Sequence, residues 1–167
     1  MLAFRVVGNP RGKGRPRFST SNGRPRVYTD PKTVAYEKYI ASIAITQARL
    51  HQVSGPFKCC IVDITCVFRR PKRLCRRKDP DGRIICSTAR VDLDNVEKAV
   101  NDGLQRSGLI EDDRNIVKSI SRKMYGRKSH GATGVSVELP CIEIRITDDL
   151  GCFDDDRPLV SLEVSNA

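Results

Sequence analysis

The stretch from Val91 to Val117 constrains this chain most, because it gathers acidic side chains within one expected helix and the segments on either side of it. Carboxylates this close repel one another and raise each other's pKa unless a cation lies among them. Mg²⁺ is held by one or two carboxylates and keeps its other positions for water and substrate phosphate. The stretch therefore predicts a Mg²⁺ site, in which Mn²⁺ is expected to substitute. Its acidic residues include Asp92, Asp94, Asp102, Glu111, Asp112 and Asp113.

The order of residues within this stretch predicts a local geometry. Asp92 and Asp94 are two apart in an expected extended segment, so both carboxylates would project to the same side. Asp94 is a good N-cap for a helix that runs through about Ser107. The turn at residues 109–113 is expected to bring a further carboxylate back to the same site. In a purely structural alternative, Asp94 caps the helix, Asp102 pairs with Lys98, and Asp112 and Asp113 form a turn. That alternative leaves the gathering of so many carboxylates around Lys98 unexplained.

The rest of the chain is basic. The net charge is +10, yet residues 1–90 contain 20 Lys and Arg against 5 Asp and Glu, whereas residues 91–167 contain 10 against 15. This imbalance favours a polyanionic partner, most commonly a nucleic-acid backbone, over a merely solvated surface. The charge lies in two expected loops, about residues 9–26 and 69–83, and a nuclear localisation signal is a formal rival for the second. The expected DNA-binding residues are Lys13, Arg15, Arg17, Arg24, Arg26, Arg69, Arg70, Lys72, Arg73, Arg76, Arg77 and Lys78.

Hydrophobic periodicity predicts an α+β fold. Apolar residues alternate in four segments and recur at helical spacing in two others. We expect one domain over residues 1–147, a mixed sheet with the helices packed on it, and an acidic tail at 148–167. Pro140 is expected to bend or split the last strand. The expected strands lie near 2–8, 57–68, 115–125 and 134–147, and the expected helices near 31–50 and 95–107.

The remaining features indicate a soluble cytoplasmic protein. No apolar run approaches the roughly 20 residues needed to span a bilayer, and the N-terminus does not have the form of a secretion signal. The seven cysteines are odd in number and include no C-x-x-C pair, which favours reduced thiols. A zinc site at Cys66, Cys75 and Cys86 has a spacing that fits no common knuckle.

Two motifs resemble those of a known family. D-L-D-N-x-x-K-x-x-x-D-x-L spans Asp92 to Leu104, and a G-x-x-x-D-D turn spans Gly108 to Asp113. Together they resemble the signature of the RusA family of Holliday junction resolvases, Mg²⁺-dependent endonucleases often carried by phages. The segments at 13–18 and 28–37 resemble the N-terminal region of phage-type members, so the resemblance covers most of residues 1–147.

The resemblance implies roles for individual residues. Asp92, Asp94 and Asp113 match the family's catalytic, metal-holding carboxylates, and Lys98 matches its catalytic lysine. Three further residues match motif positions with weaker claims: Asn95, Asp102 and Asp112. Val91 departs from the Pro that many members have, which should affect the local turn more than the chemistry.

The implied function is resolution of branched DNA by two symmetric nicks. A C₂ homodimer would present two sites related by the symmetry of a four-way junction. Metal-activated water would attack the phosphodiester, with Lys98 as charge stabiliser or base. A broader structure-specific nuclease, active on flaps and forks, is the first alternative. A non-enzymatic DNA-binding protein is the second, and the strict D-x-D-N-x-x-K order argues against it.

Overall fold

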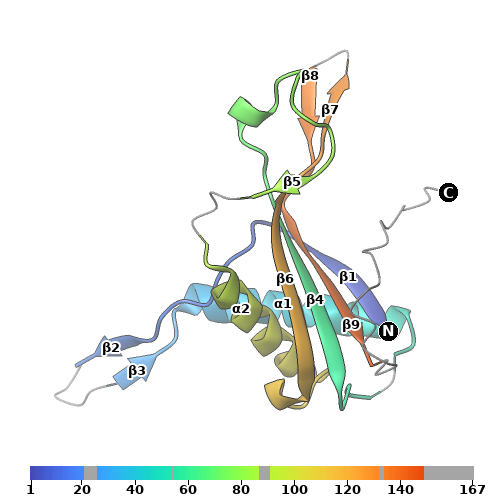
Figure 1. Cartoon of the computed structure of the whole chain (residues 1–167). Coiled ribbons are helices and arrows are strands. Elements are labelled where there is room, and N and C mark those ends of the chain that lie inside the picture. The colour runs from blue at the N-terminus through green and yellow to red at the C-terminus, as the bar shows by residue number, and fades with distance from the viewer. Residues whose placement is uncertain (21–25, 54, 87–90, 132–133, 149–167) are drawn as a thin grey trace.

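A mixed five-stranded sheet forms the centre of the structure (Figure 1). The computed structural model describes residues 1–20, 26–53, 55–86, 91–131 and 134–148. Strands β4 and β6 are parallel, and the other neighbouring pairs are antiparallel. In order across the sheet the strands are β1 (Leu2–Val7), β9 (Cys141–Thr147), β4 (Cys60–Phe68), β6 (Ile116–Tyr125) and β5 (Ile84–Ile85).

Two helices, α1 (Pro31–Leu50) and α2 (Leu93–Ser107), cover one face of this sheet (Figure 1). The strands alternate along their length, so one face of each is apolar and buried; Val62, Ile64 and Cys66 of β4 are fully buried. The core lies between this face and the helices. None of the helices in the described part of the chain is long and apolar enough to cross a membrane.

The two helices pack closely because of one glycine. A Cβ placed on Gly103 of α2 would lie 2.7 Å from Cγ2 of Ile40 and 3.3 Å from the carbonyl oxygen of Glu37, both on α1. Any larger residue would therefore push the helices apart. This contact fixes α2, which carries the acidic motif, against the body of the protein.

A distal lobe, residues 69–86, 126–131 and 134–140, extends from one end of the sheet (Figure 1). It contains η2 (Lys72–Leu74), β5 and the hairpin of β7 (Lys128–Gly131) and β8 (Gly134–Val137). Buried Arg70 donates to the carbonyl oxygens of Gly126, Pro80 and Gly82. Lys128, whose side chain is also buried, donates to the carbonyl oxygen of Arg76 and pairs with Asp81 at 3.0 Å. Two buried cations therefore hold the lobe's loops together.

The α+β class and the mixed sheet with packed helices are confirmed, with differences in detail. The last strand is split at Pro140, as expected, but its halves lie in different sheets: β8 belongs to the separate hairpin, and β9 lies inside the main sheet. The expected basic loop at 9–26 contains two short strands, β2 (Arg17–Ser19) and β3 (Arg26–Tyr28), paired with each other. The acidic tail, apart from Asp148, lies outside the described residues.

Candidate active site

Asp92 and Asp94 lie at the start of α2. The helix begins at Leu93, so Asp92 is the N-cap residue and Asp94 is already helical. The expected extended segment over both residues, with Asp94 as the cap, is therefore wrong, because the helix starts two residues earlier than expected. Asp92 makes no side-chain cap hydrogen bond, and its Oδ2 lies 3.4 Å from Nδ2 of Asn95. Both carboxylates are exposed, so their oxygens are accessible to a cation or to a substrate.

Lys98 lies one turn further along the same helix. Its Nζ is 3.3 Å from Oδ2 of Asp94, in an i,i+4 pair whose side chains are 61% and 65% exposed. A pair this exposed contributes little to stability. Since little holds the pair together, either partner is free to exchange it for a phosphate or a metal ion. The motif thus places two carboxylates and one ammonium group on a single accessible helix end.

The loop before β2 packs along this helix. The backbone N–H of Lys13 donates to the carbonyl oxygen of Asn95 at 2.8 Å, and its Nζ pairs with Asp102 at 2.5 Å. Gly12 permits this approach, since a Cβ there would lie 2.9 Å from Cβ of Asn95. Asn95 and Asp102, predicted as weaker members of the site, therefore hold the loop. Lys13, predicted to contact DNA, is engaged with Asp102.

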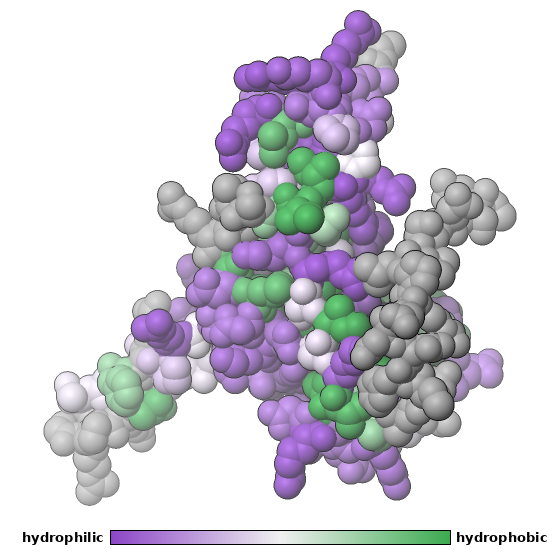
Figure 2. Space-filling view, in the orientation of Figure 1, coloured by the Kyte–Doolittle hydropathy of each residue, from purple (hydrophilic) through white to green (hydrophobic). Residues whose placement is uncertain are grey.

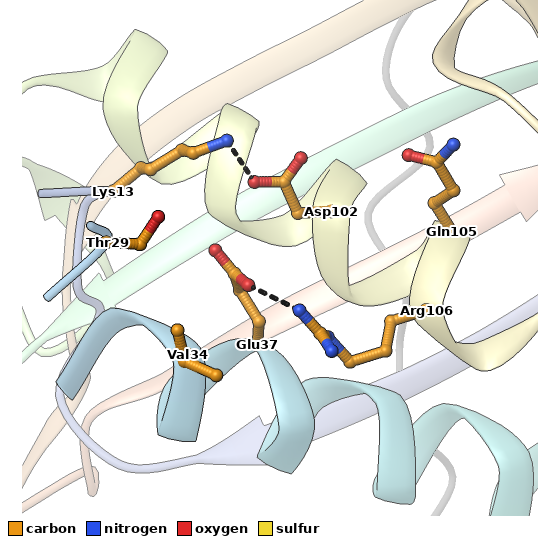
Figure 3. Close-up of a pocket in the computed structure, with 7 residues that line it drawn as sticks. All are labelled: Lys13, Thr29, Val34, Glu37, Asp102, Gln105 and Arg106. Atoms are coloured by element: carbon orange, nitrogen blue, oxygen red, sulfur yellow. Dashed lines mark hydrogen bonds and ion pairs between the residues drawn. The ribbon is translucent and has the colours of Figure 1, made fainter. Parts of the chain in front are cut away.

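A polar pocket of about 430 Å³ lies beside this loop, between α1 and α2 (Figure 3). Glu37 of α1 is almost completely buried, and its Oε2 lies 3.1 Å from Nη2 of Arg106 of α2. This ion pair joins the two helices across the pocket floor. The pocket is lined by Lys13, Thr29, Val34, Glu37, Asp102, Gln105 and Arg106.

Asp112 and Asp113 lie at the opposite end of α2. The helix is 15 residues long, which is about 22 Å at 1.5 Å per residue, and they follow its C-terminal end. Asp112 caps the short helix η3 (Asp113–Asn115), and its hydrogen bonds with Arg114 hold the pKa of its carboxyl below the usual range. The turn thus does not bring Asp113 back to Asp92 and Asp94 within one subunit. Among the described residues, no three His, Cys, Asp or Glu side chains are grouped to hold a metal ion.

Comparison with known proteins decides the family. The sequence model of a family described as "Endodeoxyribonuclease RusA" matches residues 8–139. The chain belongs to the RusA family. It is therefore an endodeoxyribonuclease, a hydrolase that acts on Holliday junctions. The "Uncharacterized protein YqaN" of Bacillus subtilis (strain 168) is 26% identical over 131 residues, which cover 76% of this chain and 89% of that protein.

In this RusA-family enzyme, most of the expected DNA-binding residues that are described lie on the surface. Arg15 is exposed before β2. Arg70 differs from the prediction, because it is buried with its guanidinium donating to three carbonyl oxygens. The exposed members in the distal lobe are Arg69, Lys72, Arg73, Arg76, Arg77 and Lys78. Arg24 and the side chains of Arg17 and Arg26 lie outside the described part of the chain.

Sequence reasoning missed one residue at the start of α2. Lys123 of β6 is half-buried, and its Nζ donates to the carbonyl oxygen of Val91 at 3.2 Å, beside Asp92. Its neighbour two positions earlier, Ser121, donates to Glu97 of α2. The signal was present in the sequence: polar residues occupy the helix-facing positions of β6, where an ordinary core strand would be apolar.

Proposed function

We propose that this RusA-family protein is a Mg²⁺-dependent enzyme that resolves four-way DNA junctions by paired nicks, and that it acts in recombination and repair. The observation that carries this proposal is the exposure of three side chains at the start of α2. Asp92 and Asp94 lie at the first turn of the helix, and Lys98 lies one turn further along. Two exposed carboxylates are the donor set that Mg²⁺ uses when substrate phosphate completes its coordination. The site therefore fits the metal that the family resemblance implies.

The chain's own residues have separate tasks in this reaction. Asp92 and Asp94 would hold the metal ion, which when bound supplies a water of lowered pKa and neutralises charge on the phosphate. Lys98 would place a positive charge beside the phosphate that is attacked or take a proton from the attacking water. The exposed cations of the distal lobe would bind the DNA backbone and position it.

In the proposed homodimer, Asp113 of each subunit contributes to the site of the other subunit. On its outer side β6 pairs with β5 at Met124 and Tyr125, and from Ile116 to Arg122 the structure places no described strand there. An exposed strand edge is a template for pairing with another chain. Antiparallel pairing of two β6 strands about a two-fold axis would put the start of one beside the end of the other.

This pairing would complete the metal site. Asp113 lies three residues before the start of β6, and Lys123, near the strand's end, contacts Val91 beside Asp92. The partner's Asp113 would therefore lie near Asp92 and Asp94. Each of the two sites of the dimer would then contain residues of both subunits.

The proposed reaction is tested with a labelled mobile four-way junction in Mg²⁺ or in EDTA. We expect paired symmetric nicks with wild type in Mg²⁺, and no cutting in EDTA or with Asp92→Asn. The variant should bind the junction at least as tightly as wild type, because it lacks one charge that repels phosphate. Asp148→Asn, which removes an exposed acid outside the site, is the matched control and should cut normally.

The alternatives give different outcomes in the same assay. Equal cutting of flaps, forks and four-way junctions would identify a broader structure-specific nuclease. Tight binding without cutting in either Mg²⁺ or Mn²⁺ would refute the enzymatic proposal and leave a DNA-binding protein.

A further inference from the structure

The β2–β3 arm, residues 17–19 and 26–28, projects from the body of the protein (Figure 1). Phe18 and Val27 face each other across its two strands, yet they are 76% and 62% exposed. Figure 2 shows hydrophobic side chains on this arm, separate from those near the sheet. Apolar side chains are usually explained by burial in a core, but this pair lies exposed on a projecting and otherwise basic hairpin.

Pairing between the two strands does not account for this surface. A cross-strand apolar pair adds roughly 0.2–1 kcal/mol to a hairpin, and isolated two-stranded hairpins are marginal in water. A Thr pair would stabilise the strands comparably without exposing an aromatic ring. The exposed ring therefore indicates a contact made when a ligand is bound.

The segment that leads into the arm is fixed to α2, the helix that begins at the candidate active site. Lys13 joins α2 through the carbonyl oxygen of Asn95 and through Asp102. The backbone N–H of Gly14 donates to Oγ1 of Thr33 on α1 at 3.1 Å. These contacts tie the segment before the arm to both helices, and the contact with Asn95 is made next to Asp94. A ligand group held by the arm would consequently have a defined position relative to the candidate active site.

The ligand must suit both the ring and the charge around it. The segment 9–20 contains four Lys and Arg and no acid, and β3 adds Arg26. Aromatic rings among cations bind single-stranded or unpaired nucleic acid, because every base offers a face for stacking. Apolar side chains inserted between base pairs also unstack and kink a duplex.

We propose that the β2–β3 arm is a wedge that inserts Phe18, supported by Val27, at the branch point and stacks on bases that it unpairs. This inference rests on the proposed function, since its ligand is the four-way junction. Opening the branch point would expose the phosphate to be cut and bring it towards Asp94. The wedge would thereby help to select branched DNA over uninterrupted duplex, in which base pairs must be broken without a junction to ease the opening.

Fluorescence of 2-aminopurine placed at the branch point measures this opening directly. Asp92→Asn protein, which we expect to bind without cutting, should raise the fluorescence of the junction, and the double variant with Phe18→Ala should not. Cutting by Phe18→Ala alone should fall about 5- to 150-fold, the range expected for one lost base stack. Phe18→Trp should retain both signals.

Controls separate stacking from other causes. Leu139→Ala removes a similarly exposed apolar side chain (71% exposed) in the distal lobe and should change neither signal. A junction with mismatched bases at its centre is already open and should restore cutting by Phe18→Ala. Sedimentation should show the same oligomeric state for Phe18→Ala and wild type.

The outcomes also distinguish the wedge from the nuclease. If wild type cuts the junction and Phe18→Ala cuts and opens it equally well, the wedge is wrong and the proposed function stands. If wild type never cuts but opens the branch point only with Phe18 present, the wedge stands and the nuclease proposal fails. Loss of the dimer in Phe18→Ala, or no rescue by the mismatched junction, would overturn the wedge.

Discussion

A site divided between two subunits predicts complementation between two inactive variants. Asp92→Asn and Asp113→Asn would each abolish both sites of their own homodimers. In a heterodimer of the two, one site would contain both substitutions and the other would contain neither. Mixing the variants after unfolding and refolding should therefore restore cutting that neither shows alone.

The amount of restored activity follows from the symmetry. Random pairing of equal amounts makes about half of the dimers heterodimers, and each has one intact site of two. Nicking should therefore reach about one quarter of the wild-type rate per subunit. The product should be a singly nicked junction, because the second site of every heterodimer is dead. Gels that separate nicked junctions from resolved duplexes measure both quantities.

A second mixture is the matched control. Asp92 and Asp94 lie at the same end of the same helix, so a heterodimer of Asp92→Asn and Asp94→Asn has one defect in each site. This mixture should stay inactive. If the mixture with Asp113→Asn also stays inactive while both variants fold and dimerise, the site does not cross between subunits and the proposed β6 pairing is wrong.

Three further predictions test the fold. Gly103→Ala should lower the free energy of unfolding by about 1–3 kcal/mol in urea titrations, because the new methyl group would overlap Ile40; an unchanged stability would show that the helices can separate. Arg70→Met should destabilise the distal lobe by roughly 2–4 kcal/mol, seen by hydrogen exchange, since three carbonyl oxygens lose their donor, whereas Lys72→Ala should weaken DNA binding and leave exchange unchanged. Burial raises the pKa of the Cys66 thiol to about 12, so in native protein this thiol should resist alkylation at pH 9 and react only after unfolding. Unfolded thiols ionise near pH 8.5. The contribution of Cys66 to the free energy of unfolding should therefore be complete below that pH and decline above it.

The sequence predicted the elements of the fold better than their environment. Period-2 and period-3.6 patterns depend on one buried face, so the long strands and both helices could be read from apolar residues. The short strands β2, β3 and β5 have two or three residues each, too few to show a period. Arg70 was expected on the surface because a basic run indicates solvent, but loop carbonyls bury its guanidinium. That arrangement depends on residues far along the chain, which no local pattern contains.

The same contrast, between relations within one element and relations between distant segments, applies to the candidate site. Acids were expected to gather around Lys98, and Asp94 lies one turn from it because residues four apart in a helix are neighbours. The path of the turn after α2 is not local, and the assumption that it returns to the helix start is where the prediction of the site failed. The length of α2 separates Asp113 from Asp92 and Asp94. Nothing in the order of residues reveals that the chain returns towards the start of α2 only along β6, which begins after Asp113.

A site of this kind couples cutting to assembly. If Asp113 comes from the partner subunit, a monomer has two of the three carboxylates and a weak metal site, so its cutting is suppressed. Dilution below the dimer's dissociation constant should then abolish cutting by mass action, even with Mg²⁺ in excess. The same two-fold axis that completes both sites also aligns them with the two strands to be cut. On this proposal, the distance between Asp94 and Asp113 within one subunit makes paired nicking a property of the dimer.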